Sequence, residues 1–154
     1  LRELLAVADV VIEGSRPAAL ARRGLGPQCL APRPGRIWLR ISGHEDHRPA
    51  FGDDAAVAGG LVGASPEGPV FCGDAIADPL TGLEAAAALA DSLGRGGGEL
   101  IEVSMAGVAA TYAALPTAPS VSRCTALPPR PPQAPLSPQG QAGVRAALEA
   151  VGAL

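Results

Sequence analysis

The chain has 154 residues, of which 47% are hydrophobic, 18% are charged and 3% are aromatic, and its net charge is −3. These values are typical of one soluble globular domain. The slight negative charge excludes a general electrostatic attraction to nucleic acid or to an anionic membrane surface. No apolar run reaches the ~18 residues of a membrane span, and we recognise no signal segment at the start.

The three cysteines, Cys29, Cys72 and Cys124, lie far apart and form no C-x-x-C pair. This pattern indicates neither a disulfide framework nor a zinc knuckle, and it favours a reducing, cytoplasmic setting. The chain starts with Leu1 rather than Met, and residues 1–8 resemble the middle of a helix. We therefore expect the sequence to be the later part of a longer protein.

Short apolar runs with β-branched residues predict three strands, over 10–13, 36–41 and 99–104. Helices are expected over 17–22, 28–30, 53–62, 79–93 and 105–114, and a turn over 65–69. A strand, a helical crossover and a second strand form a βαβ unit, in which the two strands run parallel. Because aromatic residues are few, the core has to be built from small aliphatic side chains packed between helices and sheet. The sequence therefore predicts an α/β fold.

The composition changes after residue 115. Eight of the sixteen prolines lie between Pro116 and Pro138, which predicts an extended, Pro-rich linker over 115–140. Apolar residues at helical spacing then predict a C-terminal helix over 141–154 that docks on another surface.

Asp78 is followed by Pro79 and by apolar residues at helical spacing as far as Gly94. This pattern predicts that Asp78 is the N-cap of the helix. An Asp at a helix start is favoured in its ionised form. Local chemistry alone favours a plain cap, and the alternative is a carboxylate nucleophile presented at the mouth of a pocket.

Parallel pairing brings two turns together at the carboxyl ends of neighbouring strands, the edge where open α/β sheets bind ligands. These turns are Gly14-Ser15-Arg16 and Ser42-Gly43-His44. Arg16, Arg22 and Arg23 lie on or beside the helix after the first strand, where they form either a solvated helix face or a phosphate-binding patch.

Two other groups of reactive side chains are candidates for a metal site and a nucleophile, and neither role is expected. The run His44-Glu45-Asp46-His47 is rich in metal-ligand types, but four adjacent loop residues cannot all converge on one ion, so no metal site is expected. Cys72 lies in an apolar segment and is interpreted as a packing residue rather than a nucleophile.

Five short motifs occur in a fixed order along the first 114 residues. They are Ala8-Asp-Val-Val-Ile-Glu-Gly-Ser-Arg-Pro17, the segment from Leu20 to Gly26, Ile41-Ser-Gly43, Ala77-Asp-Pro-Leu-Thr-Gly82 and Glu102-Val-Ser104. In order and spacing this region resembles the middle of the family III CoA-transferases of the CaiB/BaiF type. The resemblance implies a Rossmann-like domain over 1–114, an interlocked homodimer, and transfer of CoA between an acyl-CoA and a small free carboxylic acid.

The resemblance also implies roles for individual residues. An Asp at the position of Asp78 attacks the donor thioester, which gives a mixed anhydride and then an aspartyl-CoA thioester that an acceptor carboxylate resolves. Coenzyme A is a substrate, and no metal takes part. The family positions that hold CoA fall on Gly14, Ser15, Arg16, Arg22, Arg23, Ser42, Gly43 and His44.

Two alternatives stay open. The related acyl-CoA racemases use a His at a Gly-x-Asp motif, and the corresponding place here reads Gly52-Asp53-Asp54, which disfavours racemisation. The first strand and most of the smaller domain of the family are absent from these 154 residues. The chain could therefore be a non-catalytic remnant that binds CoA or contacts another subunit.

Overall fold

A computed structural model describes residues 1–14, 17–116, 146 and 149. The chain divides into two compact units, one of which is Leu5–Leu115. The other consists of Leu1–Leu4 and Pro116–Leu154. Most of the predicted linker and C-terminal helix lies outside the described residues. The exceptions are Leu115 and Pro116 of the linker, and Ala146 and Glu149, which are helical and exposed.

The described elements are a mixture of helices and strands. The strands are β1 (Val10–Glu13), β2 (Ile37–Ser42), β3 (Val62–Ser65), β4 (Gly68–Phe71) and β5 (Leu100–Ser104). The helices are α1 (Arg2–Val7), α2 (Pro17–Arg22), the 3-10 turn η1 (Pro27–Cys29), α3 (Gly52–Ala58), α4 (Ala77–Gly94) and α5 (Met105–Ala113). The three predicted strands are confirmed to within one residue at each end.

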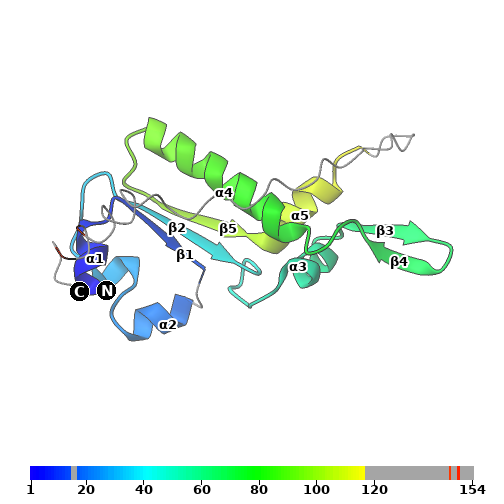
Figure 1. Cartoon of the computed structure of the whole chain (residues 1–154), viewed down its shortest axis with the longest axis horizontal. Helices are drawn as coiled ribbons and strands as arrows, with labels where there is room; N and C mark the ends of the chain where they lie inside the picture. Colours follow the sequence, from blue (N-terminus) through cyan, green and yellow to red (C-terminus); the bar gives the residue numbers. More distant parts are fainter. Residues whose placement is uncertain (15–16, 117–145, 147–148, 150–154) are drawn as a thin grey trace. The chain divides into compact units, whose positions relative to one another are not determined.

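Three strands form a parallel sheet in the order β1-β2-β5, with β2 in the centre (Figure 1). Glu13 pairs with Arg40, and Arg40 pairs in turn with Glu102. The α/β fold with a parallel sheet and flanking helices is therefore confirmed. Because all three strands run in one direction, their carboxyl ends meet at a single edge of the sheet.

The centre of the sheet is buried. Ile37 is fully buried and Leu39 is 2% exposed. Side chains two apart on a strand share a face, so these two point to the same side. Helix α4 packs against both β2 and β5. Trp38 points to the opposite face, where it borders η1 and the loop after it.

A second core lies where α3, α4 and α5 meet, and it is built almost entirely from alanine. Its buried members are Ala55, Ala56, Ala77, Met105 and Ala109. A Cβ atom added to Gly59, at the end of α3, would lie 2.6 Å from the Ala109 Cβ and 2.6 Å from the Ala106 carbonyl oxygen of α5. Small side chains therefore let α3 and α5 approach closely beside the start of α4.

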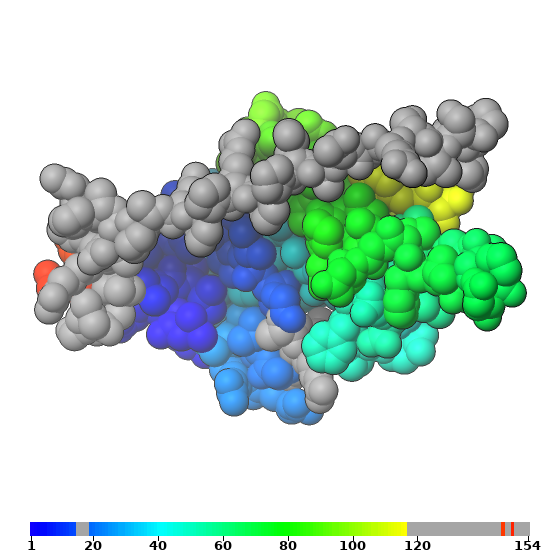
Figure 2. Space-filling view, turned by 45° about the vertical axis from the view of Figure 1, so that its right-hand side comes forward, coloured from blue at the N-terminus to red at the C-terminus, as the bar shows by residue number. Residues whose placement is uncertain are grey.

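The hairpin formed by β3 and β4 differs from the prediction. A helix was expected to continue to residue 62, but α3 ends before Gly60, which has a φ of 76°. A glycine there leaves the helical region without steric penalty and releases the chain into a strand. The predicted turn is confirmed in a tighter form, because the Ser65 hydroxyl donates to the Gly68 carbonyl oxygen at 3.1 Å. Figure 2 shows the hairpin on the right-hand side, where most of its residues are exposed.

We predict that Gly59→Ala destabilises the protein by roughly 1–3 kcal/mol, because the new methyl group overpacks the contact between α3 and α5. Gly94→Ala is the matched control, since nothing lies within 4 Å of a Cβ at Gly94. The control should change stability by less than about 1 kcal/mol. Urea unfolding of both variants measures the difference, and equal midpoints would contradict the prediction.

Candidate active site

The carboxyl ends of the parallel strands define the candidate site. Figure 1 shows α3, the first turn of α4 and the first turn of α5 on the side to which the arrows of β1, β2 and β5 point. Gly14 follows β1 directly, and the turn of Ser42, Gly43 and His44 ends β2. Open α/β sheets bind ligands at this edge, so the predicted site residues lie in a chemically suitable region.

Asp78 lies in the first turn of α4, and the prediction that it is the N-cap is wrong. The helix begins at Ala77, and the residue before it, Ile76, already has helical dihedral angles. Pro79 did not mark the first helical position, because the N–H groups of the whole first turn have no partner within the helix and any of these positions tolerates proline. Asp78 is therefore two residues deeper in the helix than expected, and the helix start has no side-chain cap.

The side chain of Asp78 is exposed and lies against α3. A Cβ atom added to Gly52, the first residue of α3, would be 2.7 Å from Asp78 Oδ2 and 2.8 Å from Asp78 Cγ. Among the described residues, none donates a hydrogen bond or forms an ion pair with this carboxylate. Two helix starts therefore meet at a carboxylate whose oxygens are available to a ligand.

The loop before α4 is held by α3. The backbone N–H of Ala75 donates to Asp53 Oδ1 at 2.9 Å. The Ala75 carbonyl oxygen accepts from the Asp78 N–H, also at 2.9 Å. Ala75 has a φ of 45°, in the left-handed region that non-glycine residues rarely occupy. The carboxylate of Asp53 is engaged in this backbone contact.

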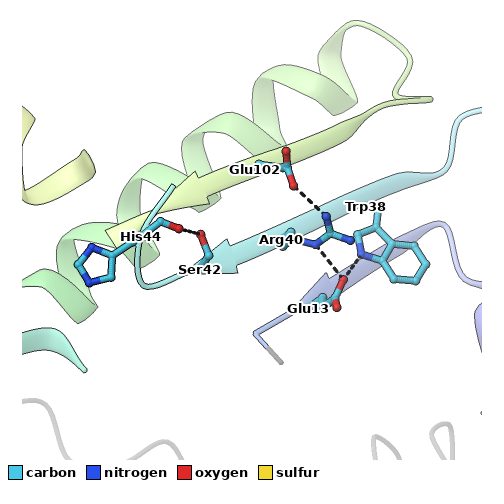
Figure 3. Close-up of polar contacts among 6 residues, drawn as sticks. All are labelled: Glu13, Trp38, Arg40, Ser42, His44 and Glu102. Atoms are coloured by element: carbon cyan, nitrogen blue, oxygen red, sulfur yellow. Dashed lines mark hydrogen bonds and ion pairs between the residues drawn. The ribbon is translucent and has the colours of Figure 1, made fainter. Parts of the chain in front are cut away.

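The turn after β2 is rigid. The Ser42 hydroxyl donates to the His44 carbonyl oxygen at 2.9 Å, and the imidazole of His44 points away from that contact (Figure 3). Gly43 is buried, and a side chain there would collide with the backbone of Ala50 and Arg48. The Gly43 carbonyl oxygen also accepts from Ala106 N–H at 3.0 Å, which ties the turn to α5.

The described CoA-binding candidates before α2 and at its end are exposed. Gly14 is exposed, with open space where a side chain would stand. Arg22 ends α2 and Arg23 follows it, and within the described part of the chain neither side chain has a hydrogen-bond or ion-pair partner. Ser15 and Arg16 lie outside the described residues. The two arginines are thus available to an anionic ligand.

A polar network that the sequence analysis missed joins the three strands just before these turns (Figure 3). Glu13 Oε2 accepts from Trp38 Nε1 at 2.8 Å and from Arg40 Nε at 3.3 Å. Arg40 Nη1 donates to Glu102 Oε1 at 2.8 Å. The Glu13 side chain is only 1% exposed and that of Arg40 12%. Charged residues within each predicted strand were the available signal, but only the register reveals that Glu13, Arg40 and Glu102 are neighbours.

A cleft of about 560 Å³ lies between α4, β5 and α5, and it does not contain Asp78. Its lining includes Glu45, Glu84, Glu102 and Ser42, the last of which is the one predicted CoA residue in it. Tyr112 donates to Glu84 Oε1 at 2.9 Å, and this contact raises the pKa of the Tyr112 phenol. Three carboxylates would repel the phosphates of CoA, so we do not assign the cleft to that ligand.

The other reactive side chains of the described residues are considered next. Asp46 pairs with Arg48 at 2.7 Å, a contact that lowers the pKa of its carboxyl. Over residues 1–14 and 17–116, no three His, Cys, Asp or Glu side chains are placed to hold a metal ion. Cys72 is an exposed free thiol, so its interpretation as a packing residue is wrong. None of the helices in the described part of the chain is both long and apolar enough to span a bilayer.

Comparison with known proteins identifies the family of the chain. The model of CoA-transferase family III matches residues 1–134, and the chain belongs to that family. The structure of Rv3272 from Mycobacterium tuberculosis in its orthorhombic form is similar, with 27% identity and a TM-score of 0.64 over 72% of this chain and 35% of the other. A CaiB/BaiF family protein from Brucella suis has 28% identity and a TM-score of 0.62 over 73% of this chain and 33% of the other. No curated protein matches. The chain thus spans about a third of the length of these solved chains.

We predict that Arg40→Leu destabilises the protein by roughly 3 kcal/mol, because it removes a cation that pairs with the buried Glu13 carboxylate and with Glu102. Arg95→Leu is the control, since Arg95 pairs with Glu99 on the exposed surface of the protein. Removing an exposed ion pair should have a much smaller effect. Urea unfolding compares the two variants, and similar losses would show that the network contributes no more than a surface pair.

Proposed function

We propose that the protein carrying this chain transfers CoA between an acyl-CoA and a free carboxylic acid, with Asp78 as the nucleophile. The observation that carries the proposal is the Asp78 carboxylate, which is exposed at the start of α4 beside the strand ends. A nucleophilic carboxylate has to be ionised, accessible and fixed in direction. Membership of CoA-transferase family III supports the reaction class.

In the proposed reaction, every step that forms one bond breaks another. An Asp78 oxygen attacks the thioester carbonyl, and the CoA thiolate leaves, which gives a mixed anhydride. The thiolate then attacks the carbonyl carbon of Asp78 and expels the donor carboxylate, which leaves an aspartyl-CoA thioester. An acceptor carboxylate repeats these two steps in reverse, so CoA moves to the acceptor and Asp78 is regenerated. No metal or redox cofactor takes part in any of these steps.

The exposed arginines support the binding of CoA at this edge. Guanidinium groups form charge-assisted, often bidentate contacts with phosphates. Arg22 and Arg23 have no protein partner among the described residues, and a bound phosphate would supply one. We propose that they hold the CoA phosphates, together with Gly14, Ser15 and Arg16. On the β2 side, the rigid turn of Ser42, Gly43 and His44 would support the pantetheine arm.

Racemisation is the less favoured activity. A racemase needs a group that exchanges the α-proton, and the residue at the corresponding place is Asp53, whose Oδ1 accepts from Ala75 N–H at 2.9 Å. The homodimer implied by the family resemblance stays a prediction. Exposed apolar side chains, such as Ile12 at 64% and Phe71 at 57%, would favour contact with another subunit.

We predict that incubation with an acyl-CoA gives a covalent CoA adduct that intact-mass spectrometry detects and that Asp78→Asn abolishes. The amide is a poor nucleophile, so the thioester cannot form. Asp74→Asn, four residues earlier and also exposed, is the matched control and should keep the adduct. The experiment uses the full protein that carries this sequence.

The outcomes separate the two open functions. An adduct that a carboxylic acid releases as a new acyl-CoA supports the transferase. An adduct that persists in Asp78→Asn would overturn the role of Asp78. The absence of any adduct, with CoA binding retained, would favour the non-catalytic CoA-binding remnant.

We predict that the double variant Arg22→Ala/Arg23→Ala weakens CoA binding by about 1–3 kcal/mol and flattens its salt dependence, because charge-assisted contacts with phosphates are lost. The control is Arg33→Ala/Arg95→Ala, which removes two exposed cations that pair with Asp9 and Glu99 near the opposite ends of the strands. Isothermal titration at two salt concentrations provides the comparison. Equal affinities for the two double variants would identify Arg22 and Arg23 as part of a solvated helix face.

A further inference from the structure

We propose that Gly52 and Asp53, the first two residues of α3, are positioning residues that fix the direction of the Asp78 carboxylate. The inference rests on the proposed function, because it assigns a purpose to the turn beneath the nucleophile. Neither residue was among the predicted CoA-binding or catalytic positions, and neither needs to touch the substrate. Their effect reaches Asp78 through the residues just before α4.

The side chain of Asp53 stabilises the turn before α4 by a hydrogen bond to the backbone of that turn. Its half-buried carboxylate accepts the N–H of Ala75 at 2.9 Å. Ala75 has a φ of 45°, a conformation that costs an alanine free energy and persists only where the surroundings enforce it. The bond from Asp53 is a contact of this enforcing kind, and a charge-assisted one.

Ala75 passes this constraint directly to Asp78. Its carbonyl oxygen accepts the Asp78 N–H at 2.9 Å, so the orientation of the Ala75 peptide sets the direction in which α4 starts. Because Asp78 lies in the first turn, a rotation of the Ala75 peptide would turn the carboxylate away from the site. Asp53, Ala75 and Asp78 thus form one continuous chain of contacts.

Gly52 supplies the space that this arrangement needs. A Cβ atom at this buried position would lie 2.6 Å from the Ala75 carbonyl oxygen and 2.7 Å from Asp78 Oδ2. Real Cβ atoms do not approach other atoms that closely, so any side chain would displace the Ala75 turn, the Asp78 carboxylate or both. Gly52 is required here for close approach, since nothing about its own backbone angles demands glycine.

The experiment compares Gly52→Ala and Asp53→Ala with the controls Gly94→Ala and Asp74→Ala in the full protein that carries this sequence. Asp53→Asn keeps an acceptor oxygen for the Ala75 N–H and should rescue most of the activity. We expect the two test variants to slow adduct formation on the order of 100-fold, as a misplaced reacting group does. The KM for acyl-CoA should change little, because the CoA-binding residues are untouched.

A second readout does not depend on activity. Hydrogen exchange at the amides of Ala75 and Asp78 should accelerate in Asp53→Ala and stay unchanged in Asp74→Ala. Unchanged exchange, or adduct rates equal to those of the controls, would overturn the positioning role. Should Asp53→Ala fail to fold, Gly52→Ala and Asp53→Asn carry the same comparison. If Asp78→Asn still forms the adduct, the proposed function fails, whereas the exchange measurement still decides whether Asp53 orders the turn.

Discussion

The close approach of α3, α4 and α5 is the constraint on which the candidate site depends. Alanines and Gly59 line their contact, so the helices pack with little side-chain material between them. Burial of a methyl-sized group contributes only about 0.8 kcal/mol, so each alanine in this core adds little to the stability of the fold. Its value is geometric, because only small side chains bring the first residue of α3 against the Asp78 carboxylate of α4.

The sheet supplies the second half of the site through a different kind of interaction. Glu13, Arg40 and Glu102 lie in register on three strands, and their contacts join the strands near the carboxyl edge. A buried ion pair adds little net stability, but it strongly penalises any slip that would separate its members. The network therefore defines the register, which sets the turn after β2 beside Gly14. The apolar core thus positions the helix starts at this edge of the sheet, and the polar network positions the strand ends.

The spacing of apolar residues and the composition were sufficient to predict the parts of the fold that depend on local sequence. The β-branched runs gave β1, β2 and β5, and the order of strands and helices gave their parallel pairing. The β3–β4 hairpin was missed because its strands are short and rich in glycine and alanine, so its pairing comes from contacts between strands rather than from residue preference. The start of α4 was misplaced because Asp-Pro is compatible with several positions in a first turn. The sequence singled out Gly52 and Asp53 only as the place of the racemase motif. Their contact with the turn before Asp78 could not be predicted, since it arises only where two helices that are distant in sequence meet.

The corrected start of α4 strengthens the functional interpretation of Asp78. As an N-cap, the carboxylate would accept a backbone N–H of its own helix, and a structural role alone would explain it. Two residues deeper, it accepts no such bond within the described residues, and the turn before the helix is held instead by Asp53 through Ala75. The carboxylate that stabilises this helix start is thus that of Asp53. Asp78 keeps both oxygens for a ligand, in a direction that the packing of Gly52 restricts, which is the arrangement that a nucleophile requires.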